Sequence, residues 1–206
     1  MARSYCYQCQ RVKEACFCHD VIQIDNAVSV IVLQHADESR INKGSAVIAK
    51  LSLKNYQCWQ GEDFSHHAAL NQLLDAAAGE ICLLYPDKGA QALPLSDPGP
   101  AGEKIKYLIV IDATWRKAKK IWSLSTNLHR LTRFKLGADI KSNYRIRKVP
   151  EDGYVSTIEA ITYSLAALEQ RPLKYQPMLA LFDAMIDFQI EKMGPQTYDK
   201  NYTDKK

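Results

Sequence analysis

An apolar run at residues 107–111 that passes directly into a helical pattern constrains the fold more than any other feature. The run reads Tyr-Leu-Ile-Val-Ile, which is typical of a buried strand, and the helical pattern covers residues 115–122. Apolar runs at 28–34 and 81–85 predict two more buried strands, and helical patterns at 45–53 and 66–78 lie between them. Strands that alternate with helices predict an α/β fold whose sheet is mostly parallel.

The remaining patterns complete a single domain with a small appendage at each end. Residues 131–136 alternate between polar and apolar and predict a half-exposed strand, whereas 93–102 and 141–148 predict loops. Helices are expected from about residue 156 and over 175–193. We therefore divide the chain into a cysteine-rich segment at 1–25, a main domain at 26–194 and a frayed, flexible tail at 195–206.

Composition limits the class of protein and its compartment. With 206 residues, of which 47% are hydrophobic, the chain can bury the core of one ordinary globular domain. Its net charge of +4 permits binding to nucleic acid without requiring it. No run of about eighteen apolar residues occurs, so no membrane span is expected, and the first residues lack the apolar stretch of a signal peptide. We therefore expect a cytoplasmic protein, in which cysteines are thiols or metal ligands more often than disulfides.

Four cysteines near the start of the chain predict a metal site. They occur as Cys6-x-x-Cys9 and Cys16-x-Cys18, and two such close pairs can supply four thiolates to one tetrahedral zinc ion. Four thiolates leave no open position for water, so the predicted role of the zinc is structural. Two alternatives are that His19 replaces one ligand and that the segment is a reduced tail without metal.

Asp112 is the best candidate for a reacting group because it follows the apolar run 107–111 directly. Ligands of open α/β sheets bind just beyond the carboxyl ends of the strands, so this carboxylate is expected at the site. The alternative is that Asp112 caps the amino end of the following helix, because aspartate is a favoured capping residue.

The helix expected after Asp112 has one apolar and one cationic side. At 100° per residue, one arc can pack on the sheet, and it holds Trp115, Ala118, Ile121 and Trp122. The opposite arc forms a cationic ridge of Arg116, Lys117, Lys119 and Lys120. Such a ridge beside a carboxylate suits a polyanionic substrate such as RNA, although it can also be a solvated face.

Two later segments carry further candidates. Ser156-x-x-Glu159 has the spacing of a capping box, which fixes the start of a helix, or alternatively its amides and hydroxyls hold a ligand carboxylate or phosphate. The loop at 141–148 places Tyr144 among the cations Arg145 and Arg147. Such a loop can stack a base and contact phosphate, or it can be an ordinary solvated loop.

Taken together, these segments resemble the DTW-domain family, the tRNA-uridine aminocarboxypropyltransferases, over nearly the whole chain. Residues 112–115, Asp-Ala-Thr-Trp, are similar to the family's Asp-x-Thr-Trp signature, and the four cysteines are similar to its N-terminal cluster. The other similar blocks are Leu84-Tyr85-Pro86, Ser142-x-Tyr144-x-x-Arg147 and Ser156-Thr157-x-Glu159. One departure follows the first strand, where the family has Asn-Thr-Gly-Arg and this chain has Asn-Lys-Gly-Ser at 42–45, so we carry over only Asn42.

The resemblance implies a SPOUT-like α/β fold for 26–194, with its C-terminal part threaded as a knot. It also implies S-adenosylmethionine as the donor and tRNA as the acceptor. The residues that would bind the donor are Leu84, Pro86, Asp112, Tyr144, Arg147, Ser156, Thr157 and Glu159. The residues that would bind tRNA are Asn42, Thr114, Trp115, Arg116, Lys117, Lys119, Lys120 and Arg145. SPOUT-like proteins are often dimers, but the oligomeric state is not predicted.

The implied chemistry fits the residues. In this family the aminocarboxypropyl group moves to N3 of a uridine, and N3–H must lose its proton first, for which Asp112 is the expected general base. The sulfonium donor is already activated, so no catalytic metal is needed. Two alternatives are an S-adenosylmethionine-dependent RNA methyltransferase and a zinc-bearing RNA-binding protein without catalysis. The by-product separates the first two, since aminocarboxypropyl transfer leaves methylthioadenosine and methyl transfer leaves S-adenosylhomocysteine.

Overall fold

A six-stranded sheet forms the centre of the computed structural model, which describes residues 4–38, 44–93, 103–137, 140–147 and 155–203. Every strand pair is parallel, and the strand order is β2-β1-β5-β3-β6-β4. The strands are β1 Ser29–Gln34, β2 Tyr56–Gln60, β3 Ile81–Leu84, β4 Gln91–Ala92, β5 Tyr107–Asp112 and β6 Thr132–Lys135. The prediction of an α/β fold with a mostly parallel sheet is confirmed.

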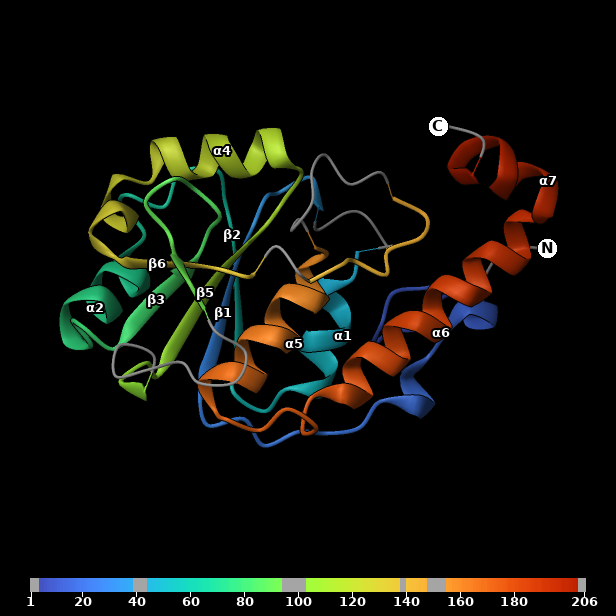
Figure 1. Cartoon of the computed structure of the whole chain (residues 1–206), viewed down its shortest axis with the longest axis horizontal. Helices are drawn as coiled ribbons and strands as arrows, with labels where there is room; N and C mark the ends of the chain where they lie inside the picture. The colour runs from blue at the N-terminus through green and yellow to red at the C-terminus, as the bar shows by residue number, and fades with distance from the viewer. Residues whose placement is uncertain (1–3, 39–43, 94–102, 138–139, 148–154, 204–206) are drawn as a thin grey trace.

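Helices cover both faces of this sheet (Figure 1). One face packs against α1 Ala46–Ser52, α5 Thr157–Leu168 and α6 Gln176–Met193, and the other against α2 Ala68–Ala76 and α4 Trp115–Leu124. The strands serve both cores because their side chains alternate, so that Val30 and Val32 face the first core and Ile31 and Leu33 the second. Sheets buried on both faces read as continuous apolar runs, which is the pattern of 28–34, 81–85 and 107–111.

Two strands and the C-terminal segment differ from expectation. The pattern did not predict β2 or the two-residue β4, because both lie at sheet edges where β2 is half-exposed and β4 is exposed. Beyond Met193, where we expected a frayed tail, the chain forms α7 Pro195–Tyr198 and a π-helical turn at Asp199–Thr203. This end of the chain projects away from the sheet (Figure 1). Among the described helices, none combines the length and apolar character needed to cross a membrane.

Candidate active site

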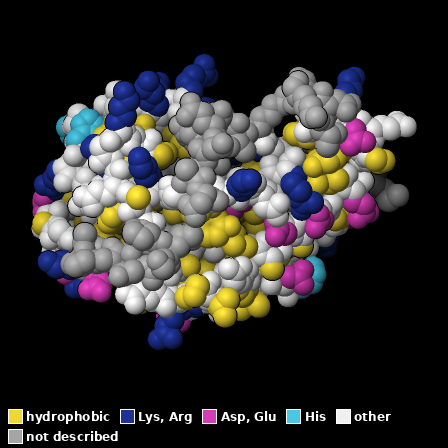
Figure 2. Space-filling model, viewed as in Figure 1, with side chains coloured by type: hydrophobic (Ala, Val, Ile, Leu, Met, Phe, Trp, Pro, Cys, Tyr) yellow, Lys and Arg dark blue, Asp and Glu magenta, His cyan; other side chains and the backbone are white. Residues whose placement is uncertain are grey.

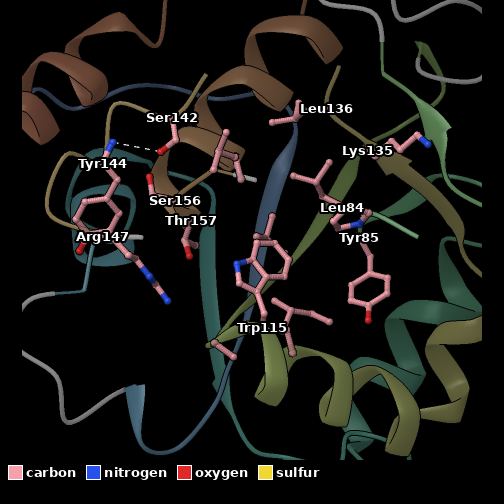
Figure 3. Close-up of a pocket in the computed structure, with 17 residues that line it drawn as sticks. Leu84, Tyr85, Trp115, Lys135, Leu136, Ser142, Tyr144, Arg147, Ser156 and Thr157 are labelled. Carbon is pink, nitrogen blue, oxygen red and sulfur yellow. Dashed lines mark hydrogen bonds between the residues drawn. The ribbon is translucent and has the colours of Figure 1, made fainter. Parts of the chain in front are cut away.

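A cleft opens at the carboxyl ends of β3, β5 and β6, where parallel sheets place their ligand sites. On the strand side it is lined by Leu84, Tyr85 and Pro86 after β3, by Trp115 after β5 and by Leu136 after β6. The opposite wall consists of the loop at 142–147 and the first turn of α5, and it supplies Ser142, Tyr144, Arg147, Ser156 and Thr157. Figure 3 shows these two walls on opposite sides of the cleft, with Tyr144, Arg147 and Thr157 on one side and Leu84 and Tyr85 on the other. The cleft therefore collects most residues of the resemblance's donor set.

Asp112 is the last residue of β5 and holds two hydrogen bonds that join separate parts of the chain. Its Oδ1 accepts from the Thr157 hydroxyl at 2.6 Å, and its Oδ2 accepts from the Gln34 side-chain amide at 2.8 Å. Each carboxylate oxygen keeps a further lone pair for another donor. Thr114 is the N-cap of α4, so the alternative that Asp112 caps this helix is wrong.

Glu159 organises the wall formed by α5 instead of lining the cleft. It is 1% exposed. Its carboxylate accepts from the backbone N–H of Asn143 at 2.6 Å, from the Ser142 hydroxyl at 2.7 Å and from the backbone N–H of Ser156 at 2.7 Å. The predicted capping box with Ser156 is present. A buried carboxylate that accepts three hydrogen bonds fixes the loop on the helix, because the carboxylate would be buried without these partners if the loop moved away.

The amides at the start of α5 are largely used within the protein. Ser156 N–H donates to Glu159, Glu159 N–H donates to the Ser156 hydroxyl, and Ile158 N–H donates to the Ser45 hydroxyl. These three N–H groups are not free to hold a ligand carboxylate. Among the described residues of this wall, Arg147 is the cationic side chain that lines the cleft. Ser45, one of the departures from the family pattern, thus has a structural contact, whereas Asn42 lies outside the described residues.

The loop at 140–147 places its two arginines in different surroundings. Arg145 pairs with Asp187 of α6 at 2.7 Å, so it docks the loop on that helix. Arg147 lines the cleft, and its guanidinium lies 5.8 Å from the centre of the Tyr144 ring. Burial raises the pKa of Tyr144, so its phenol is neutral at physiological pH. In Figure 3 Arg147 and Thr157 extend into the same space.

The cationic ridge of α4 is partly neutralised. Lys117 pairs with Asp37 at 3.0 Å and Glu38 at 3.4 Å, and Lys120 pairs with Glu62 at 2.8 Å. Arg116 and Lys119 are exposed and offer their charge to solvent. Figure 2 shows Lys and Arg side chains along the edge of the molecule where α4 lies.

One of the four residues expected to pack α4 on the sheet, Trp115, lies elsewhere. Ala118 and Ile121 pack on the sheet as predicted, and Trp122 is half-buried against the same core. Trp115 instead is 36% exposed and lines the cleft. Its position at the first turn of the helix, one residue after the N-cap Thr114, places it over the strand ends.

The four N-terminal cysteines converge as the sequence predicts. All four sulfur atoms lie within 4.8 Å of one another, with 3.7 Å between the Sγ atoms of Cys6 and Cys18 and 3.8 Å between those of Cys9 and Cys16. A tetrahedron with zinc–sulfur bonds of about 2.3 Å has sulfur–sulfur edges of about 3.8 Å, so these thiols fit one zinc ion. His19 is not part of the cluster, and its Nε2 instead lies 3.1 Å from the Oδ2 of Asp20.

Arg11 supports an anionic cluster at this position. It is 5% exposed, and its Nε and Nη2 have no hydrogen-bond partner among the described residues. Burial lowers the pKa of Arg11, and the nearby Cys9 thiol opposes this shift. Four thiolates around Zn²⁺ carry a net charge of −2, and such an anion would compensate the buried guanidinium.

Gln34 is a site residue that the sequence did not single out. It ends β1 and donates to Asp112, its neighbour across the parallel ladder. The signal was present, because a polar residue closes the apolar run 28–34 in the same way as Asp112 closes 107–111. The strand-end rule that selected Asp112 therefore also selects Gln34.

Comparisons with known proteins identify relatives over nearly the whole chain. The model of the DTW domain matches residues 3–190. A Drosophila melanogaster protein named tRNA-uridine aminocarboxypropyltransferase 2 is 31% identical over 97% of this chain and 80% of its own length. Mouse and Macaca fascicularis proteins of the same name are 26% and 24% identical, over 97% and 92% of this chain and 68% and 64% of their own lengths. No solved structure matches.

Proposed function

This chain belongs to the DTW-domain family, and we propose that it is a tRNA-uridine aminocarboxypropyltransferase that uses S-adenosylmethionine as donor. The observation that carries the proposal is the similarity to proteins of that name over nearly the full chain. The site agrees with it chemically, because a strand-end carboxylate lies beside a cleft with apolar and aromatic walls. Such walls suit the adenine and methylthio groups of the donor.

We assign the role of general base to Asp112. It takes the N3 proton of the uridine, after which N3 attacks the γ-carbon of the donor and the bond from that carbon to sulfur breaks. The positive sulfonium becomes the neutral thioether of methylthioadenosine, so no catalytic metal or covalent intermediate is required. Thr157 and Gln34 hold the carboxylate in place, and orientation of the γ-carbon toward N3 supplies the rest of the acceleration.

Arg147 is the group we assign to the donor's carboxylate. It lines the cleft beside Thr157, and its planar guanidinium can bind a carboxylate through two parallel hydrogen bonds. Tyr144, Leu84, Tyr85 and Pro86 would then enclose the less polar part of the donor. Glu159 and Ser156 contribute indirectly, because they fix the loop that carries Tyr144 and Arg147.

The direct test is transfer activity. Purified protein, S-adenosylmethionine and unmodified tRNA should yield aminocarboxypropyluridine and methylthioadenosine, measured by mass spectrometry of the nucleosides. Methylated uridine with S-adenosylhomocysteine would instead identify a methyltransferase on the same site. Loss of aminocarboxypropyluridine from the tRNA of cells that lack the protein would extend the result to the natural substrate.

For the cysteine cluster we propose one structural zinc ion held by Cys6, Cys9, Cys16 and Cys18. The sulfur spacing and the buried charge of Arg11 support it. Backbone N–H groups of Cys9 and Gln8 lower the pKa of the Cys6 thiol to about 6, whereas burial raises the pKa of the Cys18 thiol. A bound Zn²⁺ would favour the thiolate form of all four side chains. When bound, the ion would supply folding energy to the segment and no step of the reaction.

Removal of this metal should unfold the N-terminal segment. Elemental analysis is expected to find about one zinc per chain, and Cys9→Ser should lower both zinc content and solubility, because metal binding is coupled to local folding. Cys58→Ser is the matched control, since Cys58 lies on β2 outside the cluster and should leave zinc content unchanged. Complete labelling of all four thiols in the native protein, with no zinc released, would contradict the proposal.

The exposed cations of α4 should contribute to tRNA binding. Arg116→Gln with Lys119→Gln should weaken binding and reduce the slope of log K against log salt by about 0.7–0.9 for each phosphate that the protein no longer neutralises. The affinity for S-adenosylmethionine should stay unchanged. Lys106→Gln serves as the control, because Lys106 lies at the amino end of β5 and pairs with Glu80. An unchanged slope in the double variant would mean that the ridge is only a solvated face.

We further propose a SPOUT-like threading of the C-terminal part and a cytoplasmic location. The first is supported by the family resemblance and by a cleft built between strand ends and the start of α5. The second is supported by the proposed zinc-binding cysteines and the proposed tRNA substrate, because thiols stay reduced in the cytoplasm and tRNA is present there.

A further inference from the structure

A second hollow lies beyond Asp112 and runs along β2, from Tyr56 at its amino end to Gln60 at its carboxyl end, where it also reaches Gln34 at the end of β1. Its walls are formed by the strand ends with Gln34 and Gln60, by α1 with Val47 and Lys50, and by the cysteine-rich segment with Gln10. None of its described lining residues belongs to the cleft at β3, β5 and β6. Among the described residues the cleft and the hollow are therefore separate concave sites, and both reach the carboxyl ends of the strands.

A row of polar side chains connects the two sites. In the parallel ladder Asp112 is the partner of Gln34, and Gln34 is the partner of Gln60. Side chains of directly paired residues point to the same face of a sheet, so these three lie side by side across β5, β1 and β2. The Asp112 carboxylate bonds through Oδ1 to Thr157 in the wall of the cleft and through Oδ2 to Gln34 in the wall of the hollow. The Asp112 carboxylate thus lies between the cleft and the hollow.

The two sites differ in the chemistry of their walls. The cleft has apolar and aromatic side chains such as Leu84 and Trp115. The lining of the hollow is more polar and includes glutamine amides, the phenol of Tyr56 and the carboxylate of Glu38 beside a few apolar side chains. Burial raises the pKa of Tyr56, so that its hydroxyl stays protonated and can donate. Uracil presents two carbonyl oxygens on either side of N3–H, and such an edge is matched by amide and hydroxyl donors around one carboxylate.

We propose that this hollow binds the uracil base of the acceptor nucleotide, while the cleft binds the donor, so that the two react across Asp112. This inference rests on the proposed function. The N3 proton passes to Asp112, the N3–carbon bond forms as the carbon–sulfur bond breaks, and methylthioadenosine leaves through the cleft. Gln60 and Gln34 line the hollow, and the side-chain N–H groups of Gln60 and the second side-chain N–H of Gln34 can donate to the uracil carbonyls. These carbonyls share the negative charge that develops after N3 loses its proton, so the hydrogen bonds stabilise it.

The borders of the hollow suit a nucleotide within an RNA chain. Lys50 of α1 lines the rim and is exposed, so it can contact a phosphate beside the bound base. The cysteine-rich segment contributes Gln10, which is held at φ 56 although most side chains avoid this left-handed region. A wall made by this segment gives the folded cysteine cluster a direct role in shaping the acceptor site.

The proposal is tested by changing the hollow and measuring donor and acceptor separately. Gln60→Leu should lower kcat/KM for tRNA about 10-fold, the effect of removing one hydrogen bond to substrate. Val47→Trp, which fills the hollow from α1, should lower it at least about 100-fold. In both variants the Kd for S-adenosylmethionine, measured by calorimetry, should stay within about two-fold of wild type. Gln57→Leu is the matched control, because Gln57 is exposed on the same strand, does not line the hollow, and should keep wild-type activity.

The outcomes separate this inference from the proposed function. A wild-type protein that forms no aminocarboxypropyluridine overturns the proposed function, and the assignment of the hollow falls with it. An active wild type whose Gln60→Leu and Val47→Trp variants keep full kcat/KM overturns the assignment alone. Equal losses of donor affinity and tRNA turnover also overturn it, since the hollow would then belong to the donor site. Circular dichroism and zinc content of each variant establish that it is folded.

Discussion

Asp112→Asn is expected to lower the transfer rate by about 10²–10⁴, the usual contribution of a positioned acid–base group. Asparagine keeps the size of the side chain but cannot take the N3 proton. The local structure should survive, because a reoriented Gln34 amide and the Thr157 hydroxyl can each bond to an asparagine amide. Binding of S-adenosylmethionine and tRNA should therefore stay near wild type, and single-turnover assays with saturating substrates measure the loss.

The pH dependence distinguishes a base from a purely structural residue. A rise in pH should partly rescue Asp112→Asn, because solvent then deprotonates the uridine without the protein's help. Asp75→Asn is the control, since Asp75 is exposed on α2, pairs with Arg130 and should leave the rate unchanged. Near-wild-type transfer by Asp112→Asn would contradict the assigned role. A loss of donor affinity equal to the loss of turnover would show instead that Asp112 holds the donor's amino group.

The sequence predicted those parts of the fold that depend on local patterns. Strands β1, β3 and β5 were predicted because each is buried on both faces and therefore reads as a continuous apolar run. The start of α5 was predicted because a capping box has a fixed spacing within one turn. The convergence of the cysteines was predicted because both pairs lie within one short segment.

Features that depend on contacts between distant segments were not predicted. The alternation in β2 carries a weak signal because that strand lies at an edge, where Gln57 is exposed and Gln60 lines a hollow. Nothing in the local pattern places Thr157 or Gln34 beside Asp112, since these neighbours follow from strand order and helix packing. The ion pairs of Lys117 and Lys120 have the same origin, because their acidic partners come from segments after β1 and β2.

The role of Glu159 can be separated into its effects on stability and on donor binding. Glu159→Ala removes the acceptor of three buried or half-buried donors, those of Ser142, Asn143 and Ser156. We expect the free energy of unfolding to fall by about 3–5 kcal/mol, because these donors lose their partner in the folded state. Urea denaturation with an unchanged m value measures this loss.

Glu169→Ala provides the matched control for this prediction. Glu169 lies at the other end of α5, its side chain is 6% exposed, and it also accepts from three groups, the amides of Ala27 and Val28 and the ammonium of Lys174. A comparable loss of stability is therefore expected in both variants. Only Glu159→Ala should also weaken S-adenosylmethionine binding, by at least about 10-fold, because the loop that carries Tyr144 and Arg147 then spends most of its time away from the binding geometry. Equal donor affinity in the two variants would mean that this loop does not form the donor site.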